Sequence, residues 1–144
     1  MQEEAISVGD FVLQLFETHK KYSGTQVDKS EILRYGHFRG WLEDSDERNP
    51  ESPLNRQSTA RIIHQFMLIE LKIPDLNDIT AATKLKDLYT CRVCANHIAQ
   101  VYTRGIMDGI KKEEPDFPDS PVLFFNHLAL VSKTEALEII GRSF

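Results

Sequence analysis

The sequence predicts a single soluble domain of the all-α class, and three observations lead to this prediction. The chain has 144 residues, a common size for one domain with its own core. Hydrophobic residues make up 41% and charged residues 27%, which is typical of a globular protein. Apolar side chains recur at helical spacing in five segments, and these are separated by Gly, Pro and polar residues.

The first two expected helices span residues 7–19 and 28–39, with a polar loop at 22–27 between them. The apolar positions of the first are Phe11, Val12, Leu15 and Phe16. Those of the second are Ile32, Leu33, Tyr35 and Phe38. Gly40 follows the second helix, and glycine is the commonest residue to end a helix in this way.

Residues 44–53 are polar and contain two prolines, so we expect a loop there. The third helix begins at Asn55 and ends before Pro74. Its apolar positions include Ile62, Ile63, Phe66 and Met67. A connector with a short helical turn at residues 79–84 leads to the next helix.

The longest helix is expected at residues 88–107, closed by Gly105 and Gly109. Its apolar stripe is Cys91, Cys94, Ala95, Ile98, Val101, Tyr102 and Ile106. Residues 111–126 contain three prolines and favour a loop, in which the apolar run 122–125 fits either a short strand pair or a buried plug.

The last helix is expected from Ser132 to the C-terminus. Its apolar positions are Ala136, Leu137, Ile139, Ile140 and Phe144.

The net charge is -5, which argues against a general nucleic-acid binder because such a protein needs a basic surface. No apolar run is long enough for a membrane span. The first four residues are acidic and do not resemble a signal peptide. Two locations therefore stay open: the cytoplasm, or the bacterial cell surface if this is part of a longer exported chain.

The sequence indicates neither a metal nor a cofactor. Cys91 and Cys94 do not form a disulfide framework, and in a helix they serve as small core residues. His97 does not complete a zinc site, because it lies on a different helical face from Cys91. The calcium-like start at residues 44–46 lacks the glycine and glutamate that a calcium loop needs.

Catalytic motifs are also missing from the sequence: it has no phosphate-binding loop, nucleophile elbow or dinucleotide turn. The five histidines show no pairing in the sequence, although folding can still bring them together. We therefore expect a protein that binds rather than catalyses.

Three of the expected helices begin alike, with an apolar residue followed by a capping residue. The caps are Ser7, Asn55 and Ser132, preceded by Ile6, Leu54 and Val131. Asp10 and Glu135 lie three residues after their caps, where a carboxylate can bond back to the cap. Apolar residues five and eight positions after each cap predict one buried face per helix: Val12 and Leu15, Ala60 and Ile63, Leu137 and Ile140.

A second motif begins at Asp87 and ends in Gly105-Ile106-Met107-Asp108-Gly109. Together with Ser132-Lys133-Thr134-Glu135 it resembles the S-layer homology (SLH) repeat, in which an Asp-containing start leads to Gly-Ile-x-x-Gly and then to Thr-Arg-x-Glu. A looser copy pairs Gly40-Trp41-Leu42 with Asn55-Arg56-Gln57-Ser58. Val93 stands where the family has Trp, and Val8 and Lys133 stand where it has Arg.

The resemblance implies one domain over residues 1–144, built as a helical trefoil of three helix–loop–helix repeats. The repeats would span residues 1–24, 25–73 and 74–144, and the first would be incomplete. The residues that carry the motif are Ser7, Asp10, Asn55, Asp87, Gly105, Gly109, Ser132 and Glu135. We expect Asp87 to cap its helix.

The resemblance also implies non-covalent attachment to an anionic cell-wall polysaccharide. Arg56 and Lys133 would then hold the negative charge, and Trp41 would stack on a sugar ring. Each has a plainer interpretation, as a solvated helix-end charge for Arg56 and Lys133 and as core packing for Trp41. The alternative function is a protein-interaction or scaffold domain that keeps the helical fold without glycan binding.

Overall fold

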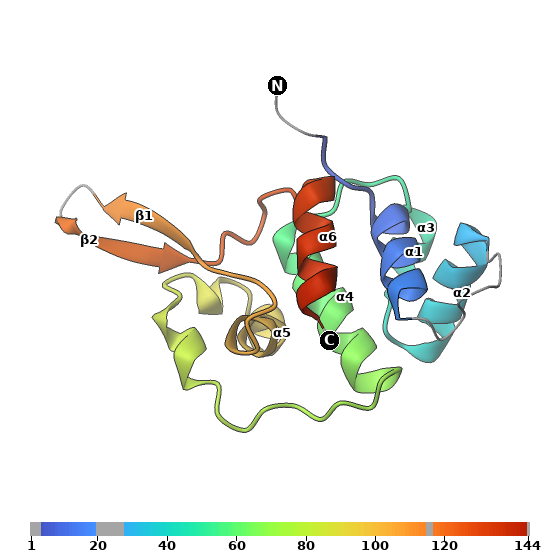
Figure 1. The fold of residues 1–144 in the computed structure, drawn as a ribbon, viewed down its shortest axis with the longest axis horizontal. Coiled ribbons are helices and arrows are strands. Elements are labelled where there is room, and N and C mark those ends of the chain that lie inside the picture. The colour runs from blue at the N-terminus through green and yellow to red at the C-terminus, as the bar shows by residue number, and fades with distance from the viewer. Residues whose placement is uncertain (1–3, 20–27, 115–116, 144) are drawn as a thin grey trace.

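The computed structural model describes residues 4–19, 28–114 and 117–143. The loop expected at residues 22–27 and the terminal Phe144 lie outside this range. Helices dominate the described residues, together with one small sheet, as expected for a mainly helical fold (Figure 1). The elements in chain order are α1 (Val8–Thr18), α2 (Lys29–Arg39), α3 (Asp44–Arg48), α4 (Arg56–Ile69), η1 (Thr80–Lys84), η2 (Leu88–Thr90), α5 (Arg92–Thr103), β1 (Ile110–Glu114), β2 (Phe117–Phe124) and α6 (Lys133–Arg142).

The helices differ most clearly from the sequence-based expectation in two regions. The region 44–53, expected to be a loop, contains the short helix α3, which a capping box between Glu43 and Asp46 begins. The long helix expected at residues 88–107 is divided, because a 3-10 turn precedes it and α5 begins only at Arg92. Cys91 therefore lies before the helix, in an extended conformation.

The starts of α1, α4 and α6 are joined by a closed ring of three backbone hydrogen bonds. The N–H of Leu54 donates to the carbonyl of Ile6 at 2.9 Å, and the N–H of Ile6 donates to the carbonyl of Val131 at 2.8 Å. The N–H of Val131 closes the ring by donating to the carbonyl of Leu54 at 2.9 Å. All three residues are buried. Three segments far apart in the sequence therefore meet at one point.

Isolated β-bridges surround this ring in a repeating pattern. Each bridge joins a cap residue to the residue two positions before the next cap: Ser7 to Pro53, Asn55 to Leu130, and Ser132 to Ala5. The first helical turns are held in the same way. The N–H groups of Val8 and Gly9 donate to carbonyls three and five residues before the cap Asn55, and those of Arg56 and Gln57 donate to the equivalent carbonyls before Ser132.

Each of the three caps accepts a hydrogen bond from the backbone N–H three residues on. The distances are 3.1 Å for Ser7, 2.8 Å for Asn55 and 3.1 Å for Ser132. The carboxylates three residues after the caps Ser7 and Ser132 were expected to bond back to their caps, but other partners hold them. Asp10 instead accepts from Lys29, and Glu135 accepts from Arg56, so both carboxylates tie their helix to a neighbouring element.

Two glycine turns have the same conformation and the same hydrogen bonds. Gly40 and Gly105 both take a left-handed conformation, with φ of 94° and 77°. In each turn the next two N–H groups donate to the carbonyl four residues before the glycine, which is Gly36 in the first turn and Val101 in the second. The two residues after each glycine are buried, at Trp41-Leu42 and at Ile106-Met107.

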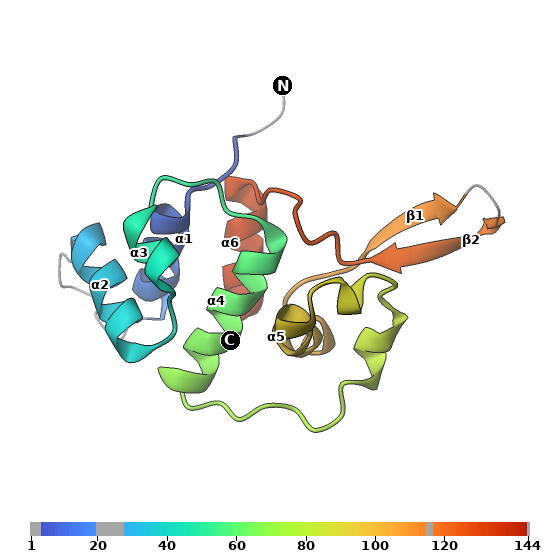
Figure 2. The same ribbon diagram turned by 180° about the vertical axis from the view of Figure 1, so that it is seen from behind.

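The strand pair expected before the last helix is present. β1 and β2 pair antiparallel, with Ile110 opposite Phe124, and this hairpin projects from the opposite end of the molecule to α2 (Figures 1 and 2). The loop expectation for residues 111–126 was therefore too simple. Phe125, just after β2, is fully buried, so the apolar run 122–125 also places one side chain in the core.

The core fills the space between α1, α4, α5 and α6, where most of the expected apolar positions are buried. Phe38 and Leu137 are exceptions: they are 86% and 55% exposed, although their helical spacing had suggested burial. Their exposure indicates that no described element covers that side of α2 or of α6. Within the described residues, no helix has the length and apolar character to cross a membrane.

Candidate functional site

A polar groove, here called groove A, opens between the starts of α1, α4 and α5 and the short helix α3. Its volume is about 390 Å³. Most of its lining residues carry hydroxyl, amide, carboxylate or guanidinium groups, or sulfur. They are Val8, Glu43, Ser45, Asp46, Asn49, Ser52, Pro53, Gln57, Ser58, Arg61, Cys91, Val93, Cys94 and His97.

The charges inside groove A are largely paired. Arg61, on α4, donates through both terminal nitrogens to the carboxylate of Asp46, at 2.8 and 2.9 Å. Its Nε lies 3.7 Å from Glu43. Asp46 also accepts the backbone N–H of Glu43 at 2.8 Å, so the start of α3 is fixed by the same carboxylate. Groove A therefore presents donors and acceptors without a free positive charge.

A chain of three hydrogen-bonded side chains begins at His97 in the wall of groove A. His97, on α5, and the buried His64, on α4, have their Nδ1 atoms 2.7 Å apart, and His64 Nε2 lies 2.6 Å from Asp75. Burial, followed by the charge of His64, lowers the pKa of His97 to about 4. His97 is therefore neutral at pH 7, and the chain joins α4, α5 and the connector before η1.

Cys91 and Cys94 form a disulfide with each other, which corrects the expectation that both are free core residues. The reason is the late start of α5: Cys91 is the cap residue and Cys94 lies in the first turn, with Cα atoms 5.2 Å apart. The disulfide lines groove A, and Cys94 is 7% exposed.

Arg56 belongs to a second, smaller hollow of about 180 Å³, here called groove B. It is lined by Arg56, Met107, Asp108, Gly109, Ile110, Glu135, Glu138, Ile139 and Arg142. Arg56 is only 5% exposed. Its Nε donates to the carbonyl of Phe125 at 2.8 Å, Nη1 to Glu135 at 3.2 Å, and Nη2 to the carbonyl of Asp108. Its guanidinium also lies 4.8 Å from the ring centre of Phe125.

Arg56 is therefore not a solvated charge, because protein groups accept hydrogen bonds from its Nε, Nη1 and Nη2. Its role as a ligand for an anion stays a prediction. Trp41 follows the packing interpretation. Its ring is 1% exposed, packs against Phe16 and Phe66, and donates Nε1 to Glu70 at 3.2 Å. Lys133 is exposed at the start of α6. The pKa of Asp10 is lowered mainly by its hydrogen bond from Lys29, and the charge of Lys133 adds a small part.

Asp87 does not cap its helix, which corrects the expected role. Its carboxylate accepts the backbone N–H of Phe125 at 2.6 Å and that of Asn126 at 2.8 Å. Its own carbonyl bonds to the buried His127 at 2.7 Å. Asp87 thus anchors the segment that leaves the hairpin. Gly109, from the same motif, packs so closely on Leu85 that a side-chain carbon would lie 2.9 Å from that leucine.

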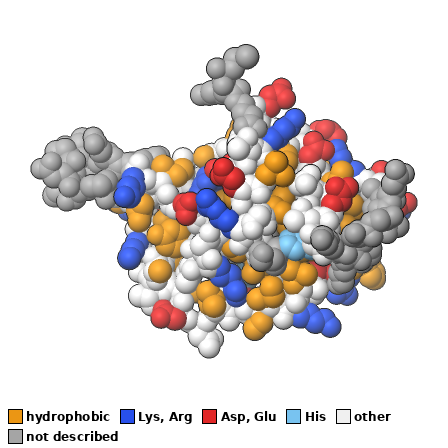
Figure 3. Space-filling model, in the orientation of Figure 1, with side chains coloured by type: hydrophobic (Ala, Val, Ile, Leu, Met, Phe, Trp, Pro, Cys, Tyr) orange, Lys and Arg blue, Asp and Glu red, His pale blue; other side chains and the backbone are white. Residues whose placement is uncertain are grey.

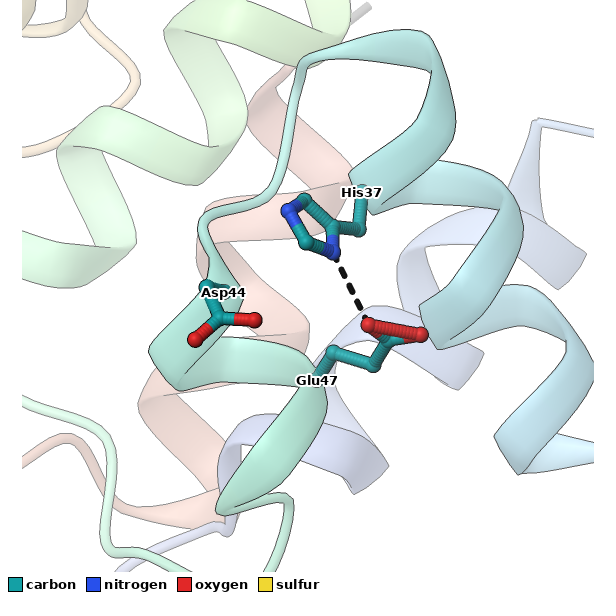
Figure 4. Close-up of side chains that lie close together, drawn as sticks. All are labelled: His37, Asp44 and Glu47. Carbon is teal, nitrogen blue, oxygen red and sulfur yellow. Dashed lines mark hydrogen bonds and ion pairs between the residues drawn. The ribbon is translucent and has the colours of Figure 1, made fainter.

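Three potential metal ligands meet between α2 and α3, as Figure 4 shows for His37, Asp44 and Glu47. Their ligand atoms lie within 4.8 Å of one another. His37 Nδ1 bonds to Glu47 at 2.8 Å, and Asp44 pairs with Arg48 at 2.9 Å. These carboxylate and imidazole groups are 30–56% exposed, which is the setting of a surface ion pair.

Little in the sequence indicates Arg61, Asp46 or the histidine chain as part of a site. Asp46 lies in a stretch expected to be a loop, and Arg61 has no motif around it. The two histidines of the chain are 33 positions apart, so only folding brings them together. A capping box at Glu43-x-x-Asp46 was the one available signal.

Comparisons with family models, with curated proteins and with solved structures find no match for this chain.

Proposed function

We propose that the chain is a non-catalytic binding module of the SLH type, with groove A as its site for a cell-wall polysaccharide. The observation that carries the proposal is the ring of hydrogen bonds among Ile6, Leu54 and Val131. A trefoil requires each helix start to meet the next in the same way. The three equivalent bridges around the ring have this property, and the matched turns at Gly40 and Gly105 repeat at the expected positions.

The two grooves support the same interpretation, because they occupy equivalent places between successive helix starts. Groove B combines Arg56, one position after its cap, with Glu135 and Glu138, three and six positions after the next cap. Groove A combines Val8 with Ser58 and Arg61 at those same positions. In groove B the arginine fills the hollow and bonds across it. Valine at the equivalent position leaves groove A wider.

The lining of groove A favours a hydroxyl-rich ligand. Carboxylate, amide and guanidinium groups that are already fixed by one another can each hydrogen-bond a sugar hydroxyl. The Arg61–Asp46 pair, together with Glu43, gives this part of the groove no excess of positive charge. Charged side chains of both signs are also interspersed on the face that carries α1 and α6 (Figure 3). We therefore propose contact with uncharged sugar units of the polymer.

Cosedimentation with purified bacterial wall material tests this function. We expect the protein to pellet with intact wall and to stay in solution with wall stripped of its polysaccharide by acid. Ser58→Trp fills groove A and keeps the backbone bond from Ser58 to Asn55, and it should weaken binding at least tenfold. Arg34→Trp, on the exposed side of α2, is the matched control and should bind like the unaltered protein. Equal recovery with both wall preparations would exclude the glycan function.

A protein-interaction domain is the second candidate, and the exposed apolar side chains favour it. Leu128, Leu130 and Leu137 are 75%, 57% and 55% exposed around the start of α6. Apolar side chains exposed together are typical of surfaces that bind a protein. If the protein also pellets with the stripped wall, a protein partner is favoured over a glycan. That binding should then be lost in Leu137→Asp but kept in Ser58→Trp.

A further inference from the structure

The disulfide at the rim of groove A has the chemistry of a reactive site and not only of a structural link. Cys91 is the cap residue of α5 and is partly exposed, whereas Cys94 is 7% exposed. The two half-cystines therefore differ in access to solvent. An incoming nucleophile from the groove meets the sulfur of Cys91 first.

The helix start beside this disulfide favours a negative charge. α5 has twelve residues, no side-chain hydrogen bond at its cap and no acidic residue in its first turn. Among the described residues, no capping side chain and no first-turn carboxylate therefore offsets the dipole at this end of α5. A thiolate at this place is stabilised by the dipole and the first N–H groups, and lowered thiol pKa values are typical of cysteines at helix starts. Reduction of the disulfide would supply such a thiolate.

One exposed cation adds to this preference. Arg92 is the first residue of α5 and follows Cys91 directly in the sequence. Arg61 lines the same groove, but Asp46 and Glu43 compensate its charge there. The start of α5 thus favours a sulfur that leaves as an anion.

We propose that Cys91–Cys94 is a thiol–disulfide exchange site that accepts a low-molecular-weight thiol from groove A. The thiolate of that small molecule attacks Sγ of Cys91 and forms a mixed disulfide. The Cys91–Cys94 bond breaks, and Cys94 leaves as a thiolate. A second thiol then attacks the sulfur of the small molecule in the mixed disulfide. This releases a small-molecule disulfide and leaves both cysteines reduced, with two electrons transferred from the two thiols.

Glutathione is the probe for the first experiment, and the unaltered folded chain is the sample. The protein is equilibrated with buffers of different ratios of reduced to oxidised glutathione, alkylated and analysed by mass spectrometry. We expect reversible conversion between the disulfide and dithiol forms, with the circular dichroism of the helices unchanged. A disulfide that reduced glutathione opens only in denaturant would overturn the proposal.

Two single variants test which sulfur is attacked. With oxidised glutathione, Cys94→Ser leaves Cys91 free and should form the mixed disulfide at least tenfold faster than Cys91→Ser, in which the buried Cys94 is free. Equal rates, or faster reaction at Cys94, would contradict the proposed order. If either variant fails to fold, the reduced unaltered protein answers the same question, since limited alkylation should label Cys91 first. The glycan function plays no part in these measurements.

Discussion

Nη1 of Arg56 lies 3.2 Å from Oε2 of Glu135, so the first residue of α4 is bonded to the first turn of α6. Arg56 is 5% exposed and also donates to two backbone carbonyls. A charged side chain in this setting is needed by its partners, because each would lose a hydrogen bond without it. The arginine that the motif singled out is thus part of the helix junction.

Arg56→Ala should lower the free energy of unfolding by about 3 kcal/mol, because it leaves an acidic group and two carbonyls without their donor. Urea unfolding followed by circular dichroism measures this. Lys133→Ala, at the equivalent but exposed position of α6, should change stability by less than about 0.5 kcal/mol. Equal effects of the two substitutions would show that Arg56 has no special structural role.

Gly105→Ala should destabilise the chain by about 1 kcal/mol through backbone strain alone. The glycine has φ of 77°, and an added side-chain carbon would meet no atom within 4 Å. Gly141→Ala is the matched control, since the same space is open at a position within α6. Helix propensity predicts a gain of up to about 1 kcal/mol there. Thermal unfolding should therefore shift in opposite directions for the two variants.

Glu70→Ala should destabilise the chain by about 2–3 kcal/mol. The Glu70 carboxylate is fully buried and accepts hydrogen bonds from Arg39 Nε at 2.8 Å and from Tyr35 and Trp41 at 3.2 Å. The substitution leaves these donors without that acceptor in a buried place. Trp41 is the single tryptophan, so its fluorescence follows the unfolding directly. A variant as stable as the unaltered protein would contradict this arrangement.

Acid should destabilise the chain through His97. Burial lowers the pKa of His97 to about 4 in the folded state, below the ordinary value of 6.5. Between these two values the unfolded chain takes up a proton that the folded chain does not, so stability falls as the pH drops below 6.5. The contribution is up to about 1.4 kcal/mol for each pH unit.

Urea unfolding at pH 7.5 and at pH 5 tests the acid effect. His97→Gln, which carries no titrating group, should lose less stability than the unaltered protein between these two pH values. An identical loss in both proteins would assign the acid sensitivity to other groups.

Local sequence patterns predicted most helices, because the start and end of a helix depend on residues that are near in the sequence. The caps Ser7, Asn55 and Ser132 and the terminating Gly40 act within one helical turn, so their spacing alone reveals them. The predicted burial of Phe38 was wrong because burial depends on distant elements and not on near neighbours. Its helical spacing is correct, but burial depends on whether another element covers that side of α2.

The site was harder to predict because its contacts join distant segments. The backbone bonds of Asp87 to Phe125 and Asn126 depend on where the hairpin returns, which the sequence does not reveal. The disulfide was missed because the expected helix included Cys91, although α5 begins after it. A shift of a few residues in one helix boundary therefore changed the predicted chemistry of two cysteines.

One closed ring of backbone hydrogen bonds holds the three helix starts together. Native-state hydrogen exchange of the amides of Ile6, Leu54 and Val131 probes this ring, because all three protons lie in it. We expect the three amides to exchange with similar, high protection and to respond together to added urea. Fast exchange at Ile6, with Leu54 and Val131 still protected, would show that the ring does not hold the three starts as one unit.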